Sequence, residues 1–439
     1  MKTPIADFID KYVESNFSRF HMPGHKGVGE IEKYDITEIA GADVLYSADG
    51  IINESENNAS RLFGTEHTYY CTEGSTLAIK AMLAVASKGK SKTILAARNV
   101  HKSFVYGCAL LDIDVRWIYP DSFDHLCSCI ISKENVETAL SGLTEPPFAV
   151  YVTSPDYLGN IADIKGIANV CRKAGVPLIV DNAHGAYLNF LEPSLHPIAL
   201  GAAMCADSAH KTLPVLTGGA YLHVSKDYPG FAKGARSALS LFASTSPSYL
   251  ILGSLDKCNR YASEHLPEKL NKAIESTHKA KEALLEMGFA VSESEPLKIV
   301  IDAESAGYTG TYLSCLLRKC GIEAEFADHR YLVLMTSPMN TEDDYARLVA
   351  SLSRTEARPP TSYPVPAPQK AKTAMSVRDA IMADSEAVPI DLAIGRICAS
   401  PSVSCPPAVP IVISGQLIGE AEISQFKYYG IDYVDVVKE

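Results

Sequence analysis

The sequence lacks the patterns that would attach the chain to a membrane or to a nucleic acid. No uninterrupted apolar run is long enough to span a bilayer. The segment from Met1 to Lys11 contains two aspartates and no basic flank before an apolar core, so we expect no secretory signal. Positive charge is in deficit, with a formal net charge of -12 at pH 7, whereas a nucleic-acid-binding surface needs a basic face. We therefore expect neither kind of partner.

The cysteines lack the spacing of a zinc site. Cys127 and Cys129 are separated by one residue, and Cys315 and Cys320 by four. We interpret the eleven cysteines as mostly buried thiols in a reducing compartment, which places the protein in the cytoplasm.

One pair of histidines invites comparison with a metal site. His21 and His25 bracket a Pro-Gly pair, but no third ligand follows at a useful spacing. A shaped loop is the favoured interpretation, and we predict no metal site.

What is present is the composition of an ordinary globular protein. The chain has 439 residues, of which 47% are hydrophobic and 21% are charged. This length suffices for one large domain and one or two smaller ones. The negative net charge suits a small cationic substrate.

Short apolar strands alternate with helices in the first half of the chain. The strand Thr93–Ala97 leads to a helix from Ser103, and the strand Phe148–Thr153 leads to the helix Asp163–Ala174, which has one apolar face. A fully apolar strand, Pro177–Val180, follows. The alternation predicts an α/β fold with a mainly parallel sheet and helices on both faces.

The remaining segments predict connecting and smaller elements. We expect a polar covering loop over Asp35–Ser60, a long helix-prone region from about Tyr249 to Met287, strands at Leu297–Ile301 and Tyr331–Thr336, helices over Thr311–Cys320 and from Thr341–Asp344, and short strands at Val409–Ile413. The predicted division is an N-terminal segment (1–35), a large domain (36–265), a small α+β domain (266–356), a Pro-rich linker (357–374) and a C-terminal subdomain (375–439).

Polar clusters directly follow the apolar strands. They are Gly74–Thr76, Asn99–Lys102, Ser154–Tyr157, Asp181–His184 and Ser208–Lys211. Because open α/β sheets bind ligands at the carboxyl ends of their strands, we expect these clusters to meet in one cleft.

Three of these clusters offer complementary chemistry. Lys211 follows an apolar run, where a desolvated amine becomes nucleophilic, although a surface lysine is the simpler alternative. Asp181 follows an apolar strand, where an ionised carboxylate needs a cation or, alternatively, backbone amides. Ser75 and Thr76 at a helix start either bind a phosphate or simply cap the helix.

The combination favours one cofactor. His184 can bond a phenolate oxygen, Ala183 allows a flat ring to lie against it, and His101 can stack on the opposite face. Pyridoxal 5'-phosphate (PLP) has a phosphate, a pyridinium and an aldehyde, which need a phosphate cup, a carboxylate and a lysine respectively. These partners occur in that order along the chain.

Four motifs support a specific resemblance. They are the segments His21–Gly27, Arg98–Ser103, Asp181–Ala186 and Ser208–Thr212. In these motifs, and in Thr245–Tyr249 and Cys405–Pro410, the chain resembles the bacterial ornithine/lysine/arginine decarboxylase family, whose large domain has the aspartate-aminotransferase-like fold of type I. The likeness covers most of the chain.

The resemblance implies a role for each matching residue. Lys211 is the Schiff-base lysine, Asp181 pairs with the pyridine nitrogen, and His101 stacks on the ring. Ala183 lies behind the ring and His184 approaches its oxygen. The residues implied to hold the phosphate are Ser75, Thr76, Ser208 and His210.

The resemblance also implies a shared active site. Ser244, just before the Thr-Ser-Pro run, would reach the phosphate of the neighbouring subunit, so at least a homodimer is expected. The chain resembles the shorter members, which have no N-terminal wing domain. It differs from some relatives at Asp156, Tyr157 and Asn182, which bears on the substrate.

The implied activity is PLP-dependent decarboxylation of a basic L-amino acid, with arginine or lysine ahead of ornithine. Lys211 or His210 would return a proton to Cα. An aminotransferase, a retro-aldol enzyme and a non-catalytic PLP-binding protein are the alternatives, because a fold alone does not fix the chemistry. Asp43, a partner-subunit residue or the C-terminal segment would bind the distal cation of the substrate.

Overall fold

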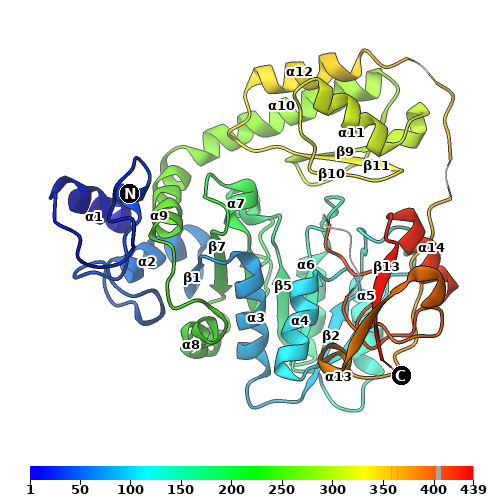
Figure 1. Cartoon of the computed structure of the whole chain (residues 1–439), viewed down its shortest axis with the longest axis horizontal. Helices are drawn as coiled ribbons and strands as arrows, with labels where there is room; N and C mark the ends of the chain where they lie inside the picture. Colours follow the sequence, from blue (N-terminus) through cyan, green and yellow to red (C-terminus); the bar gives the residue numbers. More distant parts are fainter. Residues whose placement is uncertain (357, 363, 402–406, 439) are drawn as a thin grey trace. The chain divides into compact units, whose positions relative to one another are not determined.

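The chain folds into two compact units. A computed structural model describes residues 1–356, 358–362, 364–401 and 407–438. The first unit comprises Met1–Ser91, Phe148–Ser154 and Ile164–Glu268, and the second comprises Lys92–Pro147, Pro155–Asp163 and Lys269–Glu439 (Figure 1). The finer five-part division expected from the sequence stays a prediction.

Five strands of the first unit form a sheet in the order β1-β7-β6-β5-β4. They are β1 (His67–Cys71), β4 (Ala149–Thr153), β5 (Leu178–Asp181), β6 (Met204–Asp207) and β7 (Ala220–Val224). In the second unit, β2 (Thr93–Ala97) and β3 (Asp114–Ile118) pair with each other. The pairs β4–β5, β5–β6 and β2–β3 are parallel, which confirms the predicted mainly parallel sheet.

Strand β7 is the exception, because it runs antiparallel to both β1 and β6. The connection from β6 contains only the four-residue helix α7 (Ala209–Thr212) and a turn. A parallel return needs a longer crossover, so the chain comes straight back beside β6.

The first unit contains several helices, one of which is largely buried. They are α1 (Pro4–Glu14), α2 (Ile51–Phe63), α3 (Gly74–Ser87), α6 (Ile164–Lys173), α8 (Ala232–Phe242) and α9 (Tyr249–Glu264), with the 3₁₀ turns η1 (Glu32–Tyr34), η2 (Leu45–Ser47), η3 (Ala186–Phe190) and η4 (Pro229–Phe231). Helix α3 contacts α8 on one side and β1, β5, β6 and β7 on the other. It is apolar on most sides because both faces are covered.

The loop predicted over Asp35–Ser60 is wrong in its second half, where α2 begins at Ile51. The carboxylate of Asp43 accepts hydrogen bonds from the amides of Gly50 and Ile52, each at 2.9 Å. These bonds satisfy amide donors at the start of the helix. Asp43, expected as a possible partner of the substrate's distal cation, is therefore a capping residue in this structure.

The helix-prone region predicted from about Tyr249 to Met287 is confirmed, and it contains two helices. Helix α9 ends at Glu264 and α10 (Leu266–Glu286) begins after His265. Pro267 lacks an amide hydrogen and its ring clashes with a preceding helical turn, so the helix is interrupted just before it.

The second unit contains an antiparallel sheet in the order β10-β11-β9-β8. Its strands are β8 (Ala290–Val291), β9 (Lys298–Asp302), β10 (Phe326–Ala327) and β11 (Tyr331–Met335). Residues of α10, α11 (Gly310–Lys319) and α12 (Glu342–Leu352) form a core with β9 and β11. Thr341 and Asp344 form the capping box at the start of α12, as predicted.

The second unit also contains helices, strands and 3₁₀ turns outside this sheet and its core. They are α4 (Lys102–Leu111), α5 (Lys133–Ser141), α13 (Val377–Met382), α14 (Glu420–Tyr428), β12 (Ser385–Pro389), β13 (Tyr433–Val437), η5 (Ala303–Ala306) and η6 (Ile390–Leu392). Strands β12 and β13 pair antiparallel.

The strand predicted at Val409–Ile413 is wrong, because this segment is buried but belongs to no named strand. Pro410 has no amide hydrogen to donate to a ladder. Cys405 and Pro406 of the neighbouring motif, and residues 357 and 363 of the predicted linker, lie outside the described residues. Among the described helices, none combines the length and apolarity needed to cross a membrane.

Candidate functional site

Lys211 and His184 are brought together in the first unit. The amine Nζ of Lys211, on α7 after β6, lies 2.9 Å from Nε2 of His184, which follows β5. His184 is buried and Lys211 is half-buried. Because β5 and β6 are parallel neighbours, the segments after their carboxyl ends meet. The predicted strand-end arrangement therefore holds for this pair.

Asp181 is the last residue of β5 and is 2% exposed. Its carboxylate accepts a hydrogen bond from the Tyr151 hydroxyl at 3.2 Å and one from the Ala183 amide at 3.2 Å. Burial raises the pKa of Asp181 to about 6, although the positive charge of Lys211 and these two bonds pull it down. The carboxylate is thus ionised at neutral pH. Burying this charge costs free energy, and an additional cation would stabilise it.

Two serines from different elements meet at the start of α3. The hydroxyl of Ser208, after β6, donates to the hydroxyl of Ser75 at 2.8 Å. Gly74 begins α3 with φ +71, and the space in which a side chain at this position would lie is open. Thr76, in the same turn, is exposed. Hydroxyls beside the amides and positive dipole end of a helix suit an anionic group such as a phosphate.

His210 is fixed by the backbone. Its Nδ1 lies 2.9 Å from the carbonyl oxygen of Gly219, so Nδ1 carries the hydrogen and donates. Burial lowers the pKa of His210. The imidazole is therefore neutral at pH 7, with Nε2 as the nitrogen that can take up a proton.

His101 and Ser244 are two further residues that were expected in the site. His101 belongs to the second unit, where its Nδ1 accepts from the Ser103 amide at 3.1 Å at the start of α4. Its stacking on a ring stays a prediction. Ser244 belongs to the first unit, is exposed, and donates through its amide to the Glu73 carboxylate at 2.9 Å. Glu73 directly precedes the Gly74–Thr76 turn.

Sequence reasoning missed Tyr151 and Gly219. Tyr151 lies inside β4, where alternation puts it on one face, but only the pairing of β4 with β5 shows that its hydroxyl reaches Asp181. Gly219 contributes a carbonyl, which no side-chain pattern signals.

The two histidines near the start of the chain have separate partners. His21 Nε2 lies 2.7 Å from the Tyr12 hydroxyl, and His25 Nε2 lies 3.2 Å from the Asp35 carboxylate. The Gly27 amide donates to His25 Nδ1 at 3.0 Å. These bonds support the predicted shaped loop.

The described residues of the first unit fit PLP. An amine with a neighbouring imidazole suits the aldehyde, the buried Asp181 suits a pyridinium, and Ser75 and Ser208 at the start of α3 suit the phosphate.

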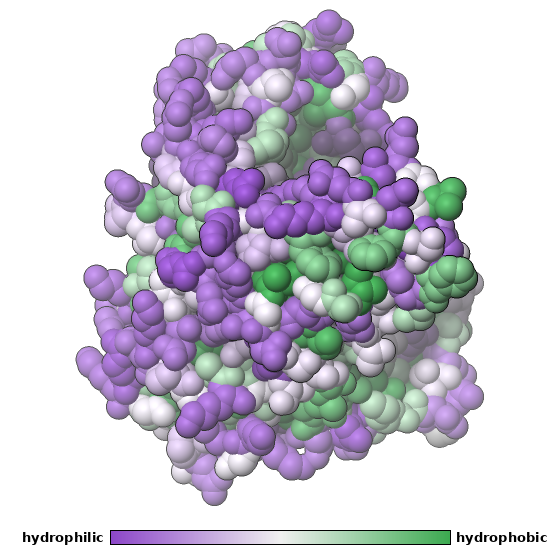
Figure 2. Space-filling model, turned by 90° about the vertical axis from the view of Figure 1, so that its left-hand side faces the viewer, coloured by the Kyte–Doolittle hydropathy of each residue, from purple (hydrophilic) through white to green (hydrophobic). Residues whose placement is uncertain are grey.

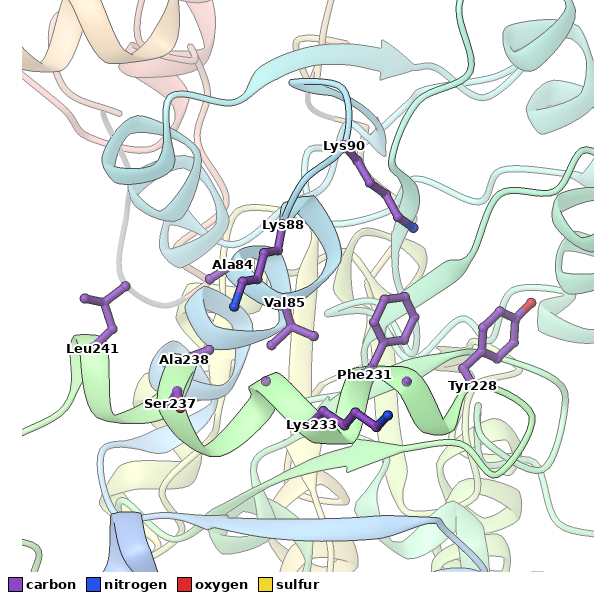
Figure 3. Close-up of a pocket in the computed structure, with 12 residues that line it drawn as sticks. Ala84, Val85, Lys88, Lys90, Tyr228, Phe231, Lys233, Ser237, Ala238 and Leu241 are labelled. Atoms are coloured by element: carbon purple, nitrogen blue, oxygen red, sulfur yellow. The ribbon is translucent and has the colours of Figure 1, made fainter.

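A separate cavity of about 610 Å³ lies at the other end of α3 (Figure 3). Its lining includes Val85, Lys88, Phe231 and Lys233, and none of the candidate residues. This cavity is therefore not the candidate cofactor site.

Comparison with known proteins gives one family and several close relatives. The family model described as Orn/Lys/Arg decarboxylase, major domain, matches residues 3–301. The arginine decarboxylase of Bacillus subtilis (strain 168) is 30% identical over 96% of this chain and 92% of the relative. The arginine decarboxylase of Halalkalibacterium halodurans is 29% identical over 97% and 93%. The crystal structure of the Francisella novicida lysine decarboxylase covers 99% of this chain and 81% of its own at 18% identity, with a TM-score of 0.83. This last likeness shows the fold.

The raised pKa of Asp181 predicts a stability cost in the cofactor-free protein. The folded pKa of about 6 lies above the ordinary range of an aspartate, so the protonated form favours folding and this advantage is lost as pH rises through 6. Asp181→Asn should therefore stabilise the cofactor-free protein relative to wild type by about 1 kcal/mol more at pH 8 than at pH 5. Urea unfolding at both pH values measures this difference.

Asp227→Asn is the matched control, because Asp227 is exposed on a turn. The change in the free energy of unfolding caused by Asp227→Asn should be the same at both pH values. Parallel pH profiles for Asp181→Asn and wild type would contradict a raised pKa at this position.

Proposed function

We propose that this chain, which belongs to the Orn/Lys/Arg decarboxylase family, acts on arginine. It is a PLP-dependent decarboxylase of basic amino acids. Relatives named arginine decarboxylase match almost its whole length at 29% and 30% identity, whereas the likeness to a lysine decarboxylase structure, at 18% identity, supports the fold alone. The observation that carries the activity is the contact between the Lys211 amine and His184. Lys211 follows β6, which is paired with β5, the strand that ends in Asp181.

Each residue of the site has a proposed task. Bound PLP supplies an electron sink for the electron pair left when the Cα–carboxylate bond breaks. Lys211 attaches the cofactor, and Asp181 holds a proton on the pyridine nitrogen. Tyr151 donates to Asp181 and so favours its ionised form.

The proton returned to Cα comes from a group near the lysine. We assign this step to Lys211 or to Nε2 of His210, because the Gly219 carbonyl occupies the other ring nitrogen of His210. His184 orients the Lys211 amine at 2.9 Å and approaches the ring oxygen. His101 and Ala183 would each contact the cofactor ring.

The phosphate is held at the start of α3. We assign this role to Ser75, Thr76 and Ser208, with the amides of the first turn. His210 was also expected here, and its bond to Gly219 leaves only Nε2 for this contact.

We infer that the enzyme is a homodimer or a higher homo-oligomer with shared sites. Figure 2 shows apolar areas, in green, on the side where α1 lies in Figure 1. The N-terminal segment exposes Phe17, Phe20, Val28 and Ile31, and Phe20 is 97% exposed. Exposed apolar clusters of this kind are typical of subunit interfaces. Ser244 reaches the phosphate of the partner in this arrangement.

The state of the cysteines supports a cytoplasmic location. The ten described cysteines are free, and eight of them are buried. We place the enzyme in the cytoplasm, where thiols stay reduced.

The substrate is tested with a panel of amino acids. The purified enzyme with PLP should release CO2 from L-arginine at a kcat/KM at least about tenfold above that for L-lysine or L-ornithine, which corresponds to about 1.4 kcal/mol of transition-state discrimination. Lys211→Ala should release none, whereas Lys226→Ala, a change at an exposed lysine after β7, should be unaffected. Keto acid without CO2 would identify an aminotransferase, and a preference for lysine would refute the proposed substrate.

The shared site is tested by complementation. Ser244→Asp should be inactive because its carboxylate repels the partner's phosphate, and Lys211→Ala should be inactive because it lacks the lysine. In a one-to-one mixture of dissociated and reassociated variants, hybrid dimers regain one intact site, so about a quarter of wild-type activity should return. No recovery in a mixture that forms hybrid dimers would contradict a shared site.

A further inference from the structure

A second cluster of reactive side chains lies in the first unit and has no task in the proposed reaction. It consists of Cys205 and Asp207 on β6, His223 on β7 and His196 on the segment before β6, and we call it the His196 cluster. One ligand atom from each residue lies within 4.8 Å of all the others. All four residues are 0% exposed.

Strand pairing brings these residues together. Cys205 and Asp207 are two positions apart on β6 and therefore point to the same face. Cys205 is paired with His223 on the antiparallel strand β7. The Phe63 ring covers the cluster, with centroid distances of 5.5 Å to His196 and 4.4 Å to His223. The site is therefore closed to solvent.

The distances match the edges of a tetrahedral metal site. Asp207 Oδ2 lies 3.0 Å from His196 Nε2 and 3.2 Å from His223 Nε2. Cys205 Sγ lies 3.7 Å from His196 Nε2 and 3.6 Å from Asp207 Oδ1. Tetrahedral zinc, with bonds of about 2.0 to 2.3 Å, places nitrogen and oxygen ligands about 3.3 Å apart and sulfur about 3.6 Å from either.

The surroundings of His223 allow it to act as a metal ligand. Thr68 lies 2.8 Å from the Thr65 hydroxyl and 2.9 Å from His223 Nδ1, and either hydroxyl of the threonine pair can be the donor. Thr68 is therefore able to accept a hydrogen bond from His223 Nδ1. In that arrangement Nε2 of His223, which lies 3.2 Å from Asp207, carries no proton and can bind a metal ion.

The charges of the four ligands balance a divalent ion. One carboxylate, one thiolate and two neutral imidazoles give a neutral site with a divalent cation, which lowers the cost of burial.

We propose that the His196 cluster binds one zinc ion, or a similar divalent transition-metal ion, as a closed structural site. The ion displaces one proton from Cys205 and binds Nε2 of both histidines, and each neutral ring then carries its proton on Nδ1. His196 Nδ1 has no hydrogen-bond partner among the described residues, so its ligation is the costliest of the four. Because the site is closed, the ion enters during folding.

The proposed metal site would fix the segment after β5, which carries Asp181 and His184. The side-chain amide of Asn182 donates to Asp207 Oδ1 at 2.7 Å, and Asn182 directly follows Asp181. Linear spacing gave no sign of this, because the four residues lie on three separate segments. From the sequence we expected no metal site, and that expectation rested only on the spacing of histidines and cysteines along the chain.

Metal analysis of the purified full-length protein tests the proposal. Tag-free protein purified without chelators and exchanged into metal-free buffer should contain about one zinc ion per chain, whether or not PLP is bound. Folded wild-type protein with less than about a tenth of an equivalent of metal would overturn the proposal.

Cobalt substitution gives a second measurement that does not depend on activity. Protein produced with Co2+ should show visible tetrahedral cobalt bands and a near-ultraviolet thiolate-to-cobalt band. Cys205→Ser should lose the thiolate band, while Cys171→Ser, at another buried thiol on α6, should keep it. Metal that stays bound equally in Cys205→Ser and His223→Gln would be adventitious and would refute the site. If these variants do not fold, the metal content of the wild type decides.

Discussion

The ionised carboxylate of Asp181 at the buried end of β5 is the constraint on which the site depends. Burial makes this charge costly, and the Tyr151 hydroxyl, the Ala183 amide and the Lys211 charge offset only part of the cost. In the proposed site a pyridinium would supply the missing cation, so the cofactor and the folded site would stabilise each other. The same electrostatic demand explains why a catalytic carboxylate can lie within an otherwise apolar strand.

The parallel sheet turns that local demand into a site. Strands β5 and β6 end at the same edge, which places His184 beside Lys211, while Ser208 reaches Ser75 at the start of α3. Helix α3 is packed between α8 and the strands, so its first turn is held by a rigid core. Each ligand-binding residue therefore belongs to an element whose position is fixed by burial rather than by the ligand.

Much of this could be predicted from local pattern, and the failures have identifiable causes. The apolar strands and the polar residues after them predicted Asp181, His184 and Lys211 in one place. Tyr151 was missed because a strand sequence does not show which neighbour its side chain faces. The capping bonds of Asp43 to α2 were missed because they depend on a turn with positive φ. The His196 cluster was missed because it forms only when β6 and β7 pair.

The most direct test of the account is to find the lysine that holds the cofactor. Reduction of the native enzyme with borohydride fixes the bond between lysine and PLP, and mass spectrometry of the digested protein locates it. The account predicts a single modified peptide containing Lys211. Modification at another lysine, or none in enzyme that decarboxylates arginine, would contradict it.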